Sequence, residues 1–276
     1  ALGSEALDAN TTANNNVAIG SASLGVNTTG DQNTAVGTFA LDANTTGASN
    51  TAVGTSALSA NTTAIGNTAV GDVSAYSNTT GANLAAFGRY ALYFNTTGSS
   101  NAGLGFQSLF SNTTASNNTA VGYQSLYTNT TGTGNSALGK GSLSGNTTAS
   151  YNTGLGENAL LTNTTGASNT AVGNSALYAN TTASNNTAVG YYALLSNTTG
   201  TANTAVGKTA LALSTTASRN TTLGYRSGYS VTTGSDNTLV GTDSGYHLTT
   251  GAKNTILGKY NGNQGGLDIR TSSNNI

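Results

Sequence analysis

The side chains that could perform acid–base or metal chemistry are few and widely spaced. Nine carboxylates and one histidine, His247, occur in 276 residues, and there is no cysteine. Only Asp236 and Asp243 are spaced so that the repeat described below could bring them together, and a solvated turn explains them more simply than paired-carboxylate catalysis. The other acids are Glu5, Asp8, Asp31, Asp42, Asp72, Glu157 and Asp268.

A single histidine without a second nitrogen or sulfur ligand does not predict a metal site. No glycine-rich stretch is followed by the Lys-Ser/Thr pair of a phosphate-binding loop. We therefore expect no enzyme activity, no metal and no cofactor.

Asparagine and threonine recur together and allow two further interpretations. Asn-Thr-Thr, as at 10–12, matches an N-glycosylation acceptor, but a repeated turn accounts for the same residues. Paired threonines in regular register also resemble the ladders of ice-binding solenoids. Those proteins usually carry Thr-x-Thr on one strand, whereas the two threonines here are adjacent and should point apart.

The composition excludes several classes of protein. Charged residues make up 6% of the chain, against roughly 25% in an ordinary domain. The chain has a net charge of −1 and contains no proline, cysteine, methionine or tryptophan. It carries no basic face for a phosphate backbone, and no run approaches the ~20 apolar residues of a spanning helix. We expect neither nucleic-acid binding nor membrane insertion.

The sequence repeats every 17 residues, without insertion or deletion, from Gly3 to Gly258. Counting from each such glycine as offset 0, the consensus is G-x-x-[AS]-L-x-x-N-T-T-[GA]-x-x-N-T-A-V. Only an array in which each repeat stacks on the one before requires such constancy. The repeat is too short for two helices and their turns.

The repeat therefore predicts an all-β parallel β-solenoid of about sixteen coils, each with two or three short strands around N-T-A-V and A-L. At about 4.8 Å per coil, the array would extend roughly 75 Å. We expect a core of Leu from offset 4 and Val from offset 16, together with a ladder of stacked Asn amides at offset 13. The core residues are Leu41, Val53, Leu58, Val70, Leu126, Val172, Leu177 and Val189, and the ladder residues are Asn33, Asn50, Asn67, Asn118, Asn169 and Asn186.

Offset 5 collects aromatic side chains on the face opposite the predicted core. The column includes Tyr76, Tyr93, Phe110, Tyr127 and Tyr178. An exposed stripe of this length is unusual on a monomer, so we expect it to be buried between copies of a homo-oligomer. The alternative is that it stacks on sugar rings of a surface glycan.

The segments N-N-V-A-I-G-S-A-S-L (15–24) and N-T-A-V-G-T-F-A-L (33–41) resemble the head repeats of YadA-like trimeric autotransporter adhesins. The whole repeat and the stretch G-G-L-D-I-R-T-S-S-N-N-I (265–276) resemble bacteriophage tail-fibre proteins more closely. The resemblance implies a left-handed, homotrimeric β-roll. The repeat here is longer than the adhesin repeat of about fourteen residues, and we place the extra length in the N-T-T-G turn.

Three regions follow from the pattern: a regular array over 1–206, variant repeats over 207–264, and an exit segment over 265–276 toward a further C-terminal region. In the variant repeats Leu at offset 4 becomes Gly228, Gly245 and Gly262, and we expect apolar residues at offset 7, Val231 and Leu248, to replace it. We expect the shaft of an extracellular fibre, on a virion tail or a cell surface. Its partners would be further copies of the chain and, through regions outside it, a host surface glycan or protein.

Overall fold

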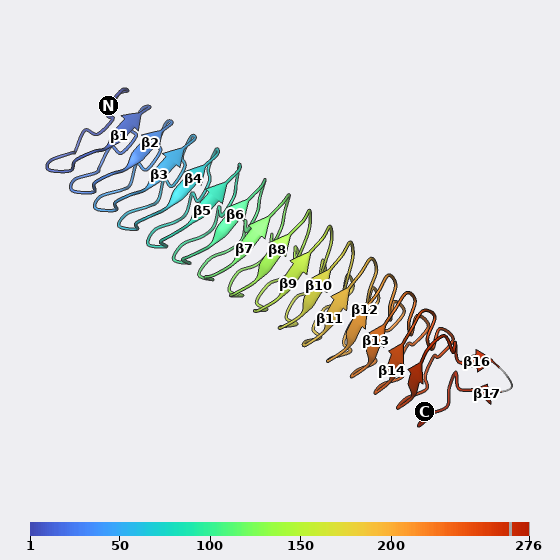
Figure 1. Cartoon of the computed structure of the whole chain (residues 1–276). Coiled ribbons are helices and arrows are strands. Elements are labelled where there is room, and N and C mark those ends of the chain that lie inside the picture. The colour runs from blue at the N-terminus through green and yellow to red at the C-terminus, as the bar shows by residue number, and fades with distance from the viewer. Residues whose placement is uncertain (265–266, 276) are drawn as a thin grey trace. The chain divides into compact units, whose positions relative to one another are not determined.

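The computed structural model describes residues 1–264 and 267–275 and shows an all-β solenoid in which each 17-residue repeat forms one coil. The chain divides into two compact units, Ala1–Asn135 and Ser136–Ile276. No helix occurs among the described residues. In both units the coils contribute one three-residue strand each, and successive strands pair in parallel (Figure 1).

The strands recur at the same place in every repeat. Unit 1 contains β1 Val17–Ile19, β2 Thr34–Val36, β3 Thr51–Val53, β4 Thr68–Val70, β5 Ala85–Phe87, β6 Ala102–Leu104 and β7 Thr119–Val121. Unit 2 contains β8 Ser136–Leu138, β9 Thr153–Leu155, β10 Thr170–Val172, β11 Thr187–Val189, β12 Thr204–Val206, β13 Thr221–Leu223, β14 Thr238–Val240 and β15 Thr255–Leu257, followed by the antiparallel pair β16 Asn263–Gln264 and β17 Leu267–Asp268. Paired residues are 17 apart, as in Thr51 with Thr68.

The A-L segment was predicted to be a strand, and that prediction is wrong. Residues at offsets 2 and 4 lie in the left-handed region, as at Ser56 and Leu58, both with φ of 52°. The Ser56 N–H donates to Thr38 O of the preceding coil at 2.9 Å, and the Leu58 N–H donates to Ser74 O of the following coil at 3.0 Å. The segment is therefore a turn that hydrogen-bonds to both neighbouring coils, although no strand forms.

Leucines at offset 4 fill the interior, as predicted. Leu41, Leu58, Leu126 and Leu177 are fully buried. The predicted valines are not in the interior: Val53 is 36% exposed, and Val70, Val172 and Val189 are only half-buried. Side chains alternate along a strand, and the middle residue, Ala in most coils, faces inward instead. Leu from the opposite turn already occupies the interior, so only a small side chain fits there.

In the variant coils the small residue lies in the turn and the large residue lies in the middle of the strand, the reverse of the regular coils. Gly228 and Gly245 replace the interior Leu, while Leu239 and Ile256 replace the mid-strand Ala and are buried. A Cβ at Gly228 would lie 2.9 Å from Leu239 Cδ1, so the strand residue occupies the space left by the turn residue. Val231 and Leu248, at offset 7, are fully buried, but they stand where the regular coils have a buried asparagine. The predicted replacement of Leu from offset 7 is therefore wrong, because strand side chains fill the space beside Gly228 and Gly245.

We expect Gly228→Leu to lower the free energy of unfolding by about 1–3 kcal/mol through overpacking against Leu239. Leu239→Ala alone should cost about 2–5 kcal/mol through a cavity. The double variant restores the consensus pair and should recover most of either loss, which chemical denaturation of the four proteins would measure as a coupling energy above ~1 kcal/mol. Additive losses would show that the two side chains do not share one space.

Residues 270–275, within the predicted exit segment, stack on the last coil. The Thr249 N–H donates to Arg270 O at 2.8 Å, and the Thr255 N–H donates to Asn275 O at 2.7 Å. Asn275 continues the asparagine ladder, since its Nδ2 donates to Asn254 Oδ1 at 2.7 Å. The separation from Asn254 is 21 residues, so a four-residue insertion precedes this partial coil. Residues 265–266 and 276 of that segment lie outside the described residues.

Candidate functional surfaces

The predicted asparagine ladder at offset 13 is confirmed. Asn33, Asn50, Asn67, Asn118, Asn169 and Asn186 are all fully buried. Asn186 Nδ2 donates to Gly200 O at 2.9 Å, and its Oδ1 accepts from the Asn203 N–H at 2.9 Å and from Asn203 Nδ2 at 3.1 Å. One amide thus satisfies a buried backbone donor and a buried backbone acceptor of the following coil, which would otherwise cost about 1–3 kcal/mol each.

A second buried asparagine ladder runs through offset 7. Asn44 Nδ2 donates to Asn27 Oδ1 at 2.9 Å and to Gly47 O at 3.0 Å, and the same pattern continues at Asn61. Sequence reasoning had placed this asparagine in the Asn-Thr-Thr turn without assigning it a ladder. Its occurrence in twelve coils was the signal that could have revealed it.

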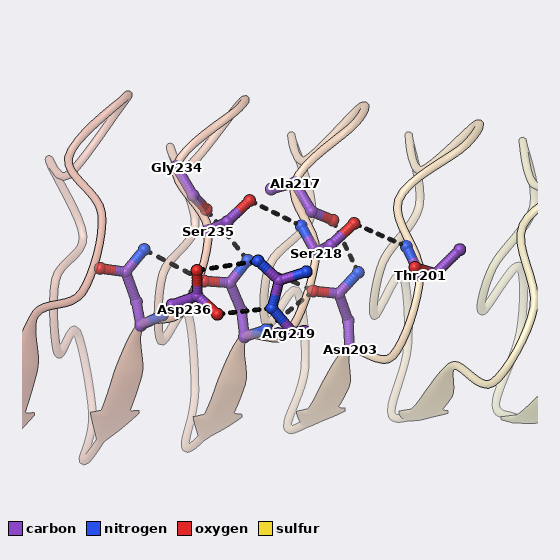
Figure 2. Close-up of polar contacts among 10 residues, drawn as sticks. Thr201, Asn203, Ala217, Ser218, Arg219, Gly234, Ser235 and Asp236 are labelled. Carbon is purple, nitrogen blue, oxygen red and sulfur yellow. Dashed lines mark hydrogen bonds and ion pairs between the residues drawn. The ribbon is translucent and has the colours of Figure 1, made fainter.

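The outer turn carries a third set of contacts, formed by serines at offset 11 (Figure 2). Ser235 Oγ accepts from the Ser218 N–H at 3.0 Å, and Ser218 Oγ accepts from the Thr201 N–H at 3.0 Å. Beside them Arg219 Nε and Nη2 donate to both carboxylate oxygens of Asp236, at 2.6 and 3.0 Å. All of these contacts join one coil to the next.

One coil breaks the ladder at offset 13. Leu84 stands there and is 2% exposed, while the same coil has Ala75 where twelve coils have Leu. Asn101, which follows Leu84 in the column, has no acceptor for its backbone N–H among the described residues, whereas the Leu84 N–H donates to Asn67 Oδ1 at 2.9 Å. In this coil an apolar side chain, Leu84, thus takes the place of the ladder amide.

We expect the double variant Ala75→Leu/Leu84→Asn to raise the free energy of unfolding by about 1–3 kcal/mol, because it supplies an acceptor to the buried Asn101 N–H. Leu84→Asn alone should gain less or lose stability, since it leaves unfilled space beside Ala75. Urea denaturation of the three proteins tests this. A double variant less stable than the parent would contradict the role assigned to the ladder.

The structure does not pair Asp236 with Asp243. Each belongs to its own ion pair with the preceding coil, Asp236 with Arg219 and Asp243 with Arg226. The Arg219 hydrogen bonds hold the pKa of Asp236 below its ordinary value, so this acid is an ionised partner and not a proton donor. Asp72, Glu157 and Asp268 also form ion pairs with basic residues.

The other acids lie near the N-terminal end of unit 1. Asp31 Oδ1 accepts from the Asn14 N–H at 2.6 Å. Glu5, Asp8 and Asp42 line a shallow cleft of about 250 Å³ together with apolar side chains. Among the described residues no group of three or more His, Cys, Asp or Glu side chains could hold a metal ion.

Four of the five predicted stripe aromatics form one stacked column in unit 1. The ring centroids of Tyr76 and Tyr93, Tyr93 and Phe110, and Phe110 and Tyr127 are 5.3, 5.5 and 5.2 Å apart, with interplanar angles of 8°, 13° and 6°. Tyr178 lies in unit 2, is 37% exposed, and has no aromatic ring in contact among the described residues. Within the column each ring covers its neighbour's face, so mainly ring edges remain for a ligand.

The outward face of the strands presents two further columns. The first residue of most strands is Thr and the third is Val, Leu, Ile or Phe, and both are exposed or half-buried while the middle residue is buried. Leu104 in β6 is 38% exposed, and Leu138, Leu155 and Leu223 in unit 2 are 48%, 40% and 49% exposed. An apolar column in regular register on a surface marks an interaction site.

A scan of protein-family models and searches of curated proteins and of solved structures returned no match to this chain. Within the described part of the chain, no helix is long and apolar enough to cross a membrane.

Proposed function

We propose that this chain is a structural shaft segment of an extracellular fibre. The observation that carries the proposal is that several recurrent columns of polar side chains join coil to coil. Two asparagine ladders, a serine column and threonine hydroxyls at offset 8, such as Thr45 Oγ1 on Thr62 O at 3.2 Å, all bond in the stacking direction. A repetitive stack whose coils bond to one another, and whose described residues bring no catalytic groups together, suits a mechanical role.

The shaft would be a homo-oligomer, and a trimer is the state that the resemblance to β-roll adhesins favours. The outward apolar column supports a second copy of this chain as its occupant. Its side chains recur once per coil, as at Val172, Val189 and Val206, and an identical column on another copy has the same period. Covering this column would remove from water side chains that are half-buried or more exposed in the single chain.

The resemblance to phage tail fibres favours a virion over a cell surface, and a bacterial adhesin or filament subunit is the alternative. An antiserum raised against the chain, with gold-labelled secondary antibody, would distinguish them in electron micrographs of the source culture. We expect label along fibres attached to virus particles. Label along filaments on intact cells would support the adhesin, and label confined to the interior of sectioned cells would overturn both.

Ice binding is a lesser candidate, and one observation favours it. Seven threonines in register, from Thr153 in β9 to Thr255 in β15, point outward from consecutive strands of unit 2. The threonines at offset 8 do not add a second exposed column of hydroxyls, because their hydroxyls bond to backbone, as Thr181 Oγ1 does to Thr198 O at 3.2 Å. Thermal hysteresis of the purified chain at millimolar concentration would support ice binding, and its absence would remove this candidate. Glycan stacking along the aromatic column is disfavoured by the covered ring faces.

A further inference from the structure

A small cleft in unit 2 lies outside the regular columns of the coils. It has a volume of about 230 Å³ and is lined by Arg226, Asp243, Tyr246, His247, Lys259 and Asn261. Pockets for drug-sized ligands usually measure about 300–1,000 Å³, so this one suits a single small group. Its lining residues come from three consecutive repeats, and none belongs to the regular columns of Leu and Asn.

Arg226 is held rigidly at the wall of the cleft. Its Nε donates to Asp243 Oδ1 at 2.7 Å, and its Cζ lies 4.7 Å from the ring centroid of Tyr225 and 4.9 Å from that of Tyr246. Two tyrosine rings and one carboxylate contact the guanidinium and fix its plane. Little side-chain entropy therefore remains to be lost when a ligand binds. The side chain is still 37% exposed.

The terminal nitrogens of Arg226 have no hydrogen-bond acceptor among the described residues. Arg219, in the same unit, provides the comparison: it makes the same coil-to-coil pair with Asp236 but uses both Nε and Nη2. Arg226 uses Nε alone. A guanidinium with free N–H groups in a fixed plane is suited to recognise a planar or tetrahedral oxyanion through two parallel hydrogen bonds.

The other groups of the cleft are also donors. Lys259 forms no ion pair with a described residue, and Asn261 accepts from the Asn263 N–H through Oδ1, which leaves its Nδ2 to donate. His247 is exposed and lies edge-on to Tyr246, with ring centroids 4.9 Å apart. Asp243 is the one acid in the lining, against Arg226 and Lys259. The cleft thus carries net positive charge in a chain whose net charge is −1.

We infer that this cleft binds a small oxyanion, a carboxylate or sulfate group carried by a ligand, through the free N–H groups of Arg226, the Lys259 ammonium and the Asn261 amide. The shared chemistry is an acceptor-rich, singly or doubly charged group of a few atoms. An acidic sugar and inorganic sulfate both provide it, and the experiment separates them. The inference does not depend on the role of the chain as a fibre shaft.

The test titrates the full ¹⁵N-labelled chain with sodium glucuronate, sodium sulfate, or glucose, at constant ionic strength set with sodium chloride, and follows amide shifts. We expect saturable shifts around residues 226, 243–247 and 259–261 with glucuronate or sulfate and none with glucose. Tighter binding of glucuronate identifies a sugar carboxylate as the ligand, and tighter binding of sulfate identifies a sulfate group. Absence of saturation with both anions would overturn the inference.

Variants distinguish binding at the cleft from a nonspecific response of the anions to the charge of the protein. Lys259→Gln changes an exposed side chain and should weaken binding several-fold, while Arg226→Lys keeps the charge but loses the planar fork and should weaken it about tenfold. Arg219→Gln removes the matched ion pair outside the cleft and should leave binding unchanged. Equal weakening by Arg219→Gln and Lys259→Gln would show that the anions respond only to overall charge and would refute the site.

Discussion

Leu126→Asp is expected to lower the free energy of unfolding by more than about 4 kcal/mol. The Leu126 side chain is fully buried in unit 1, where the substitution removes apolar contacts and leaves a carboxylate without a basic partner. Deleting a buried Leu costs about 2–5 kcal/mol by itself, and an uncompensated buried charge adds several more. Denaturation monitored by circular dichroism measures the loss.

The loss should also be local, because each coil contacts only its neighbours. Hydrogen exchange of backbone amides should accelerate most in the coil that contains Leu126 and in those that adjoin it. Thr131→Asp, which places the same charge on the exposed threonine five residues later, should change stability by less than about 0.5 kcal/mol. Unchanged melting and unchanged local exchange for Leu126→Asp would contradict the assignment of the interior.

Gly139→Ala is expected to destabilise unit 2 strongly although it adds only one methyl group. Gly139 has φ of 131°, a region open almost only to glycine. A Cβ there would also lie 2.6 Å from the carbonyl carbon and oxygen of Gly156 in the next coil. Strain and backbone clash together should cost more than about 3 kcal/mol in the free energy of unfolding, measured by urea denaturation.

Gly145→Ala provides the matched control six residues later in the same coil. A Cβ at Gly145 would also approach a backbone oxygen, Leu161 O, at 2.6 Å, so the two sites differ mainly in φ. Gly145 does not have a positive φ, and its column already carries alanine at Ala43, Ala60 and Ala179. The local backbone should therefore adjust at a cost below about 1.5 kcal/mol. If the two variants were equally stable, the backbone geometry at offset 0 would not require glycine.

The period of the sequence was sufficient to predict parallel coils, the interior leucines and one asparagine ladder. Unbroken 17-residue spacing leaves only direct stacking, and Asn186 or Leu177 then has the same residue type above and below it. The inward residue of the strand was not predictable from hydrophobicity, because Val53 is more apolar than Ala52 yet faces outward. The interior of the coil has room for only a small strand side chain, and that room depends on which residue the opposite turn places there.

The conformation of the A-L segment, a turn and not a strand, was also not predicted. An apolar pair such as Ala57-Leu58 between polar residues indicates a strand, but Leu58 has a positive φ that single-sequence propensity disfavours. Hydrogen bonds to coils on both sides compensate for that conformation. The signal that was available is glycine at the same offset in the variant repeats, at Gly228 and Gly245, where φ is 62° and 61°. The oxyanion cleft had no sequence signal, since its donors come from different offsets.

The solution mass of the purified chain, measured by light scattering after size exclusion, tests most directly whether the outward columns assemble copies into a shaft. We predict about three times 27.2 kDa for the parent chain. The variant Val172→Lys/Val189→Lys/Val206→Lys, whose changes all lie on the outward face, should run at the mass of one chain with an unchanged circular dichroism spectrum. A parent chain that is stably monomeric at micromolar concentration would contradict the account.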